Sequence, residues 1–258
     1  MPRTAIISDI HANLDALRAV MKDYQEQQCT EVVCLGDVVG YNAYPSECLD
    51  LIRSLNGHVI KGNHDEEVVS CNKTMMNPMA RLAMDWTRSQ LRKDQLSWLS
   101  SLPYMRIIRH SRACTYGIVH SSMEKPQAWH YIINASDAAA NFAKQFPAIA
   151  FHGHTHIPKV FIWDGRHAVE DSDAMGPLYE HGSMQYTMQA GLKYFINVGS
   201  VGQPRDHDPR ACYTIFDTDT HTITMRRVAY DIAAAQQAIL DRNISEAEFL
   251  AERLATGC

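Results

Sequence analysis

The sequence contains no long apolar run, no internal repeat and no low-complexity tract, and these absences exclude whole classes of protein. No apolar run approaches the ~20 residues that a membrane-spanning helix requires. Residues 1–4 lead directly into a short strand-like segment and lack the apolar core of a secretion signal. We therefore expect a soluble, cytoplasmic protein with no membrane partner.

The cysteines and the charges are equally uninformative about a specific partner. Seven cysteines are present, an odd number with irregular spacing and no C-x-x-C pair. This pattern favours free thiols in a reducing compartment. The net charge is -5 and the basic residues are scattered, so we expect no long nucleic acid as a partner. A small phosphorylated substrate remains compatible, because bound cations can reverse the local potential.

Hydrophobic patterning predicts an α/β fold. The chain has 258 residues, 46% of them hydrophobic, which is enough for a sizeable core, and we expect one domain over residues 1–258. Apolar runs at 5–7, 31–35 and 58–60 alternate with helical patterns at 14–24 and 45–55. This β-α-β-α-β order predicts a sheet with parallel strands.

The remainder of the chain divides into a helical and a strand-rich part. Residues 66–102 show helical periodicity without strand signals, which predicts a helical insertion. A loop or hairpin is expected at 164–193, and Ser46 and a Ser245–Glu248 capping box are possible helix starts. Further strands are predicted at 114–119, 148–151, 160–163, 194–198, 211–216 and 222–228, with helices at 138–146 and after 231.

Metal-binding residue types follow several predicted strands at the point where each strand ends. Asp9, Asp37, Asn63, His120 and His154 all have this position. Ligands of open α/β sheets bind at the carboxyl ends of the strands. Each residue alone has an ordinary explanation, such as a helix cap, a turn or a core histidine. Together they predict a site for two metal ions that could act on phosphorus.

The motifs and their order resemble those of the calcineurin-like metallophosphoesterase superfamily. The resemblance extends from residue 5 to about residue 205 and implies a four-layer α-β-β-α sandwich of two packed mixed β-sheets flanked by helices. The segments that carry it are Ser8-Asp9-Ile10-His11, Gly36-Asp37, Gly62-Asn63-His64-Asp65, His120 and Gly153-His154-Thr155-His156.

The resemblance also implies the roles of individual residues. Two divalent transition-metal ions (Mn, Fe, Zn, Ni or Co) would bind, with Asp37 bridging them. A hydroxide between the ions would attack phosphorus, while His64 assists the leaving group. Asp65 would orient the ring of His64 or face solvent. One ion would be held by Asp9, His11 and His156, and the other by Asn63, His120 and His154.

Other residues near these motifs have two interpretations each. Gly199, Ser200 and Gly202 could bring backbone amides to an anion, and Arg205 could bind a phosphate oxygen. Alternatively, this segment is a tight turn that carries a surface arginine. Three aromatic residues are either walls for a leaving group or core residues: Tyr41, Trp129 and Tyr131.

One departure from the superfamily narrows the expected activity. Phosphoprotein phosphatases carry G-D-x-x-D-R-G, whereas this chain has Gly40 and Tyr41 in place of the second aspartate and the arginine. The pattern is closer to the small bacterial and archaeal phosphodiesterase branch. We expect a metal-dependent phosphoesterase that hydrolyses a phosphodiester or phosphomonoester, and the alternative is a catalytically silent scaffold on the same fold. A dimer is possible, although no sequence feature supports one.

Overall fold

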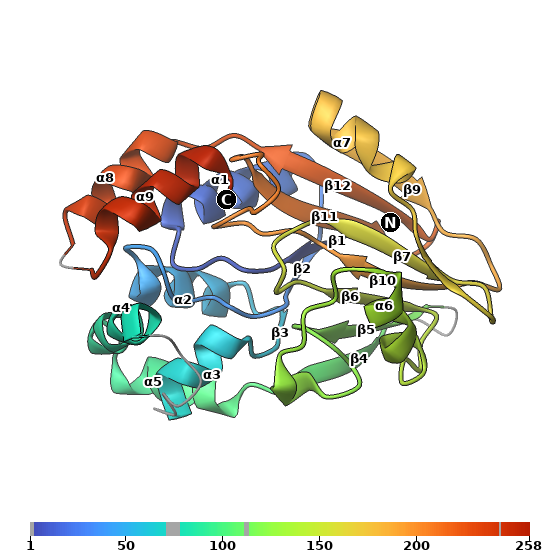
Figure 1. Ribbon diagram of the computed structural model, residues 1–258, viewed down its shortest axis with the longest axis horizontal. Helices are drawn as coiled ribbons and strands as arrows, with labels where there is room; N and C mark the ends of the chain where they lie inside the picture. Colours follow the sequence, from blue (N-terminus) through green and yellow to red (C-terminus); the bar gives the residue numbers. More distant parts are fainter. Residues whose placement is uncertain (1–2, 71–77, 111–113, 243) are drawn as a thin grey trace.

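Two mixed β-sheets form the centre of the computed structural model, which describes residues 3–70, 78–110, 114–242 and 244–258 (Figure 1). The first six-stranded sheet has the order β3 (His58–Val59), β2 (Glu31–Cys34), β1 (Arg3–Ile7), β11 (Ala211–Asp217), β12 (Thr222–Val228), β9 (Ser183–Thr187). The second has the order β4 (Met105–Arg109), β5 (Thr115–Val119), β6 (Ile149–His152), β10 (Lys193–Asn197), β7 (Lys159–Trp163), β8 (Ala168–Glu170).

Each sheet contains a parallel half. Strands β1, β2 and β3 run parallel in the first sheet, and β5, β6 and β10 run parallel in the second. The other neighbouring strands pair antiparallel. Parallel strands place all their carboxyl ends at one edge, so the loops that follow β1, β2, β3, β5 and β6 can meet there.

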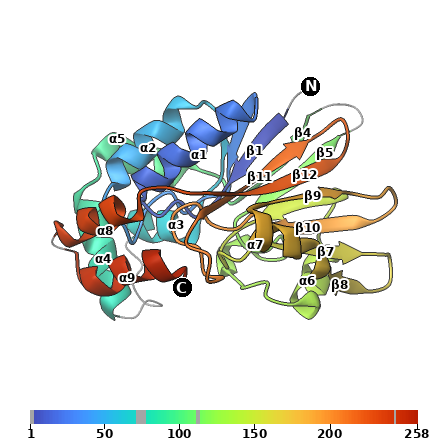
Figure 2. The ribbon, with the colours of Figure 1, turned by 90° about the horizontal axis from the view of Figure 1, so that it is seen from above.

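Alternation along the strands generates the four layers. In β1, Ala5 and Ile7 pack with helices α1 (Leu14–Glu26) and α2 (Pro45–Ser54), whereas Ile6 packs between the two sheets. On the far side, Phe195 of β10 packs against α6 (Ala135–Phe142). Figure 2 shows α1 and α2 on one side of the strands and α6 on the other. The expected α-β-β-α sandwich is therefore confirmed.

Helices at the carboxyl ends of the strands complete the structure. The described part of the predicted 66–102 insertion is helical, as α3 (Asn63–Ser70), α4 (Pro78–Ser89) and α5 (Lys93–Ser101). The C-terminal helices α8 (Ile232–Leu240) and α9 (Ala247–Thr256) pack on each other and share a hydrophobic cluster with Ala83 of α4. In the described ranges, no helix is both long and apolar enough to cross a bilayer.

Three predictions about the course of the chain were incomplete. Strand β4 was not predicted, because it is an edge strand whose side chains are mostly exposed and give little hydrophobic signal. Residues 164–193 contain β8, helix α7 (Gly176–His181) and β9, and β9 joins the other sheet rather than closing a hairpin. Helix α6 begins earlier than predicted, because the side chain of Asn134 caps it.

Both predicted helix caps were wrong, although α2 begins at Pro45 as predicted. The N-cap of α2 is Tyr44, and the hydroxyl of Ser46 donates to Oε1 of Gln95 at 3.1 Å instead. The N-cap of α9 is Glu246, which has φ 62° and no capping side chain. The chain enters α9 through this left-handed residue, so the predicted capping box of Ser245 and Glu248 does not form.

Candidate metal centre

The candidate ligands come together at the carboxyl ends of the parallel strands. Asp9 follows β1, Asp37 follows β2, His120 follows β5, and His154 follows β6. Asn63 begins α3 after β3, and His11 and His156 lie in the loops that continue from β1 and β6. All of them except Asn63 are buried. The two sheets therefore gather distant residues at one place.

The donor atoms form two adjacent groups. Those of Asp9, His11 and His156 lie within 4.8 Å of one another, as do those of Asp37, His120 and His154. Nε2 of His120 is 3.3 Å from Oδ2 of Asp37 and 3.2 Å from Oδ1 of Asn63. Oδ2 of Asp37 also lies 3.6 Å from Nε2 of His11. Asp37 thus lies between the groups, as a bridging ligand would.

Main-chain carbonyl groups orient the imidazole rings. A carbonyl oxygen only accepts hydrogen bonds, so the ring nitrogen facing it donates, and the other nitrogen of a neutral ring keeps its lone pair for a ligand. The pairs are His11 Nδ1 with Val39 O at 3.2 Å, His120 Nδ1 with Leu35 O at 2.9 Å, His154 Nε2 with Trp129 O at 2.9 Å and His156 Nδ1 with Gln203 O at 2.5 Å.

The free donor atoms fit a divalent cation. Nε2 of His11 and Nε2 of His156 are only 3.1 Å apart, so two lone pairs would face each other without a cation. Burial lowers the pKa of both rings, which keeps them neutral as metal ligation requires. Oδ1 of Asp9 is buried without a hydrogen-bond donor. The mixture of imidazole and carboxylate suits a transition-metal ion.

The carboxylates of the site are held in their charged form. Burial alone would raise the pKa of Asp9 and of Asp37, but imidazoles outweigh it, mainly His156 for Asp9 and His120 for Asp37. Burial would lower the pKa of His120, yet Asp37 and Asp9 raise it to about 9. A cation bound at His120 would displace this proton.

Five candidate ligands have a backbone conformation that is unfavourable for non-glycine residues: Asp9 (φ 53°), His11 (φ 48°), Asp37 (φ 50°), His154 (φ 68°) and His156 (φ 63°). Contacts between loops stabilise it. The amide of His11 donates to the carbonyl of Asp37 at 2.9 Å, and the amide of His154 donates to Oδ2 of Asp9 at 3.0 Å. Such concentrated backbone strain is typical of functional sites.

Two glycines allow the loops to approach the carboxylates. A Cβ atom at Gly62 would collide with the side chain of Asp37. One at Gly153 would collide with the side chains of Ser8 and Asp9. The glycines of the G-N-H-D and G-H-T-H motifs therefore determine where the two carboxylates sit.

His64 lies beside the two groups. Its amide donates to Oδ1 of Asp37 at 2.8 Å, and its ring centroid is 4.8 Å from that of His11. Its donor atom also forms a third close group with His11 and Asp37. Burial lowers the pKa of His64 to about 4, so the ring is neutral, and its buried Nδ1 has no hydrogen-bond partner.

Asp65 contacts the main chain instead of the ring of His64. Oδ1 accepts from the amide of Val38 at 3.0 Å, and Oδ2 accepts from the amide of Gly62 at 3.1 Å. The carboxyl group is fully buried, and burial together with Asp37 raises its pKa to about 7. Neither the hydrogen bond to His64 nor the solvent-facing position considered above is found. Asp65 positions the loops that carry Asp37 and Asn63.

The segment after β10 is a turn that holds the loop of Asp9. The amides of Val201 and Gly202 donate to the carbonyls of Ser8 and Asp9 at 3.0 and 2.9 Å, so neither amide is available to an anion. Arg205 at the end of this segment is half-buried. It donates to the hydroxyl of Tyr41 at 3.4 Å, and that tyrosine ring lies 4.5 Å from the ring of His64.

An aromatic-walled cavity of about 860 Å³ opens directly beside Asn63 and His154. Trp129 and Tyr131 line it, and Tyr131 stacks on the ring of His154 at 4.3 Å between centroids. Glu67 also lines it, and its buried Oε2 has no hydrogen-bond donor. The cavity can therefore receive part of a substrate whose reacting group lies at the metal centre.

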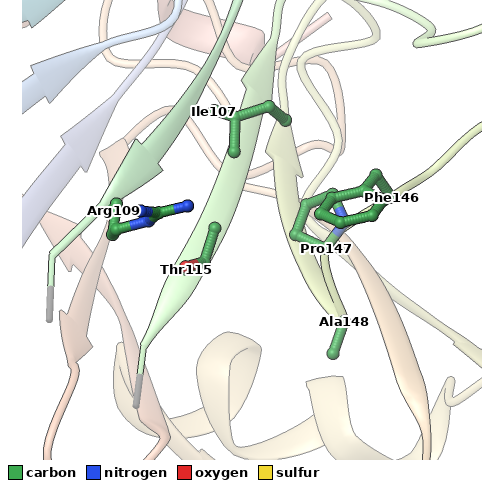
Figure 3. Close-up of a pocket in the computed structure, with 6 residues that line it drawn as sticks. All are labelled: Ile107, Arg109, Thr115, Phe146, Pro147 and Ala148. Atoms are coloured by element: carbon green, nitrogen blue, oxygen red, sulfur yellow. The ribbon is translucent and has the colours of Figure 1, made fainter. Parts of the chain in front are cut away.

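A second cavity, of about 610 Å³, lies at the opposite end of the same strands (Figure 3). Thr115 is the first residue of β5, whereas His120 follows its last. The cavity contains none of the candidate ligands: it is lined by Ile107, Arg109, Thr115, Phe146, Pro147 and Ala148. Proximity to the ligands thus favours the cavity at the carboxyl ends as the functional one.

Sequence reasoning missed two residues near the site, Glu67 and Arg253. Glu67 could have been found, because it follows His64 by three positions and so shares its face of α3. Arg253 is on α9, and the guanidinium carbon lies 6.0 Å from the ring centroid of Tyr41. No motif accompanies it, so no local signal indicated it.

Comparisons with known proteins establish the family. A family model of the calcineurin-like phosphoesterase superfamily domain matches residues 3–221. An uncharacterized protein of Methanocaldococcus jannaschii is 36% identical over 255 residues, covering 98% of this chain and 97% of that protein. The chain therefore belongs to the calcineurin-like phosphoesterase superfamily.

Solved structures agree with this assignment. The crystal structure of a metallophosphoesterase from Sphaerobacter thermophilus is 37% identical, has a TM-score of 0.84 and covers 100% of this chain and 99% of its own. A hypothetical protein from Pyrococcus horikoshii OT3 has the same fold, at 18% identity and a TM-score of 0.78, with coverage of 100% and 99%. Family membership and the clustered aspartates and histidines support a metal-dependent phosphoesterase.

Proposed function

We propose that this chain uses two divalent metal ions to hydrolyse a phosphodiester or phosphomonoester in a small substrate. One observation carries the proposal: two groups of imidazoles and charged carboxylates lie side by side, with Asp37 between them. Two adjacent cations form a clamp for in-line displacement at phosphorus. A scaffold without activity would have no need for this full set of ligands.

Each of the two groups of ligands would hold one of the two ions. Asp9, His11 and His156 would hold one ion, and Asn63, His120 and His154 the other. When bound, the ions would neutralise phosphate oxygens and lower the pKa of a water that attacks phosphorus. Manganese is a suitable first ion to test, since the ligand types accept several transition metals.

His64 would act on the substrate as a neutral imidazole. A ring whose pKa is about 4 carries a single proton at neutral pH. It can donate that hydrogen bond to a phosphoryl or leaving oxygen as charge develops there. This role requires the ring of His64 to lie close to the ions. The hydrogen bond from the main-chain amide of His64 to Asp37 supports such a position.

The surroundings of His64 favour small esters over phosphoproteins. Tyr41 replaces the arginine of the protein phosphatase motif, and its ring packs 4.5 Å from the ring of His64. The cavity lined by Trp129 and Tyr131 would receive the second ester group of a diester. We therefore favour phosphodiesterase activity.

The test combines metal analysis with turnover. Purified protein is stripped with a chelator, reloaded with manganese, and assayed with bis-p-nitrophenyl phosphate and p-nitrophenyl phosphate. We expect about two bound ions per chain by elemental analysis and turnover only in the reloaded protein. Folded protein that binds no metal, or that hydrolyses neither ester with any transition metal, would contradict the proposal.

A further inference from the structure

Two guanidinium groups face the same tyrosine ring at the edge of the candidate metal centre. The guanidinium carbon of Arg205 lies 5.9 Å from the ring centroid of Tyr41, and that of Arg253 lies 6.0 Å from it. Arg205 follows β10 and Arg253 belongs to α9, so remote parts of the chain bring these charges together. The ring of Tyr41 in turn lies 4.5 Å from that of His64.

Within the described ranges, no carboxylate side chain forms an ion pair with either arginine. Arg205 donates to the side-chain oxygens of Tyr41 and Gln203, and Nε of Arg253 donates to the main-chain oxygen of Cys258 at 2.6 Å. By contrast, Arg226 pairs with Asp23. Burial and the charge of Arg205 both lower the pKa of Arg253.

The same place contains buried donors without acceptors. Nε of Arg205 and Nε2 of Gln203 are both buried and have no hydrogen-bond partner. Leaving a buried donor unsatisfied is energetically unfavourable, so such groups are expected to have a partner in the working protein. Two neighbouring cations without a carboxylate side-chain partner in the described ranges, together with two unsatisfied donors, favour the binding of an anion.

We infer that Arg205 and Arg253 bind a second anionic group of the substrate, a phosphate or a carboxylate, while its reacting phosphate lies at the metal centre. The inference rests on the proposed function and specifies its substrate class: phosphoesters with two anionic groups. Arg253 lies beyond residues 3–221, the part that the family model matches, so family membership does not assign it a role.

A pair of matched ligands tests this inference. Propane-1,3-diyl bisphosphate and propyl phosphate share an alkyl group and differ in the second anion. Their binding to manganese-loaded protein is measured by calorimetry and by inhibition of bis-p-nitrophenyl phosphate hydrolysis, at a buffered manganese concentration. We expect wild-type protein to bind the bisphosphate more tightly than the monophosphate.

Three variants identify the source of that preference. R253Q removes the charge and should weaken bisphosphate binding about tenfold or more relative to monophosphate binding, the scale of a lost charge-assisted hydrogen bond. R253K keeps the charge and should restore part of the preference, which separates a lost charge from a lost fold. R242Q is the control, because Arg242 lies over Tyr44 in the same C-terminal region, and it should keep the wild-type ratio.

Two outcomes would overturn the inference: a wild-type protein without a preference for the bisphosphate, or an R253Q variant that keeps the full preference. Failure of the proposed function looks different, because wild-type protein would then hydrolyse neither nitrophenyl ester. If the wild type hydrolyses the esters normally and R253Q keeps the wild-type ratio of bisphosphate to monophosphate binding, the role of Arg253 is refuted. The proposed phosphoesterase function then still stands.

Discussion

The carboxylates in two regions of this molecule have different kinds of hydrogen-bond and ion-pair partners. Asp23 on α1 is matched by partners within the chain: Arg226 donates to both its oxygens, at 2.6 and 2.7 Å, and Tyr213 donates to Oδ2 at 2.6 Å. At the carboxyl ends of the strands, the ion-pair partners of Asp9 and Asp37 in the described ranges are all imidazoles. The first region has its charge partners within the chain, whereas the donor set of the second suits a bound metal ion.

This difference separates stability from function. A carboxylate with fixed donors contributes to the free energy of unfolding of the protein alone. A carboxylate that faces metal-binding imidazoles contributes further once a metal ion binds, because ions that bind only the folded state stabilise it by mass action. Substitutions in the two regions should therefore have different consequences.

The largest effect is expected for Asp37→Asn. The amide removes the charge that lies between both groups of ligands, so the variant should lose bound metal and turnover together. Elemental analysis and hydrolysis of bis-p-nitrophenyl phosphate measure the two. Asp23→Asn is the matched control in the other region and should keep both ions and full turnover. Two ions retained in Asp37→Asn would refute the bridging role.

His64→Ala should keep the metal and lose rate. Loss of a donor positioned at the reacting oxygens typically slows turnover by ~10²–10⁴. The measurement is kcat at saturating manganese, with the metal content determined on the same sample. His167→Ala, at an exposed position, provides the control. An unchanged kcat in His64→Ala would exclude the residue from the reaction.

Gly153→Ala tests whether close packing fixes the position of Asp9. The added methyl group would collide with the side chains of Ser8 and Asp9 and should destabilise the fold by about 1–3 kcal/mol while weakening metal binding. Gly176→Ala introduces the same group where no atom lies within 4 Å, and it should leave metal binding unchanged. Chemical denaturation and metal titration follow both properties. Equal metal affinity in the two variants would contradict this account.

The smallest effect concerns Asp23 and pH. Burial would raise the pKa of Asp23, but the hydrogen bonds from Arg226 and Tyr213 outweigh it and hold the pKa below its ordinary value. The contribution to stability is therefore complete above about pH 4–5 and disappears as the pH falls through the lowered pKa of the folded state. Allowing for partial exposure, Asp23→Asn should cost about 1–2 kcal/mol at pH 7.

Urea unfolding at pH 7 and at pH 3 measures this contribution. The difference between wild type and Asp23→Asn should shrink at the lower pH, where the wild-type carboxylate begins to take up its proton. A difference that stays constant between the two pH values would show that packing, and not charge, accounts for the loss.

The sequence was most informative where chemistry and local geometry coincide. Asp37 and His154 each stand next to a glycine at a strand end, so the residue type and the place in the fold could be read together. The parallel strands of the first part of the chain also followed from short apolar runs such as 5–7, whereas the four layers were expected from the family resemblance. The hydrogen-bond partners of side chains were harder to predict from the sequence. The contact of Asp65 with the amide of Gly62, for example, depends on how two loops pack together.

Features determined only by tertiary structure could not be predicted. Strand β4 gains its place from pairing with β5, not from its own hydrophobicity. Strand β9 leaves the neighbouring β8 and pairs with β12 of the other sheet. Arg253 reaches Tyr41 because α9 packs against the first half of the chain. The sequence of α9 alone does not predict that packing.

The hydrogen bonds between the loop of Asp9 and the segment at 200–202 have a consequence for biosynthesis. Asp9 leaves the ribosome well before the residues whose hydroxyl and amide hold its carbonyl, Ser200 and Gly202. A nascent chain therefore cannot fix this ligand until residues 200–202 have also been synthesised. Polypeptides that end before residue 200 lack these hydrogen bonds, and stable metal binding is delayed until that segment is present.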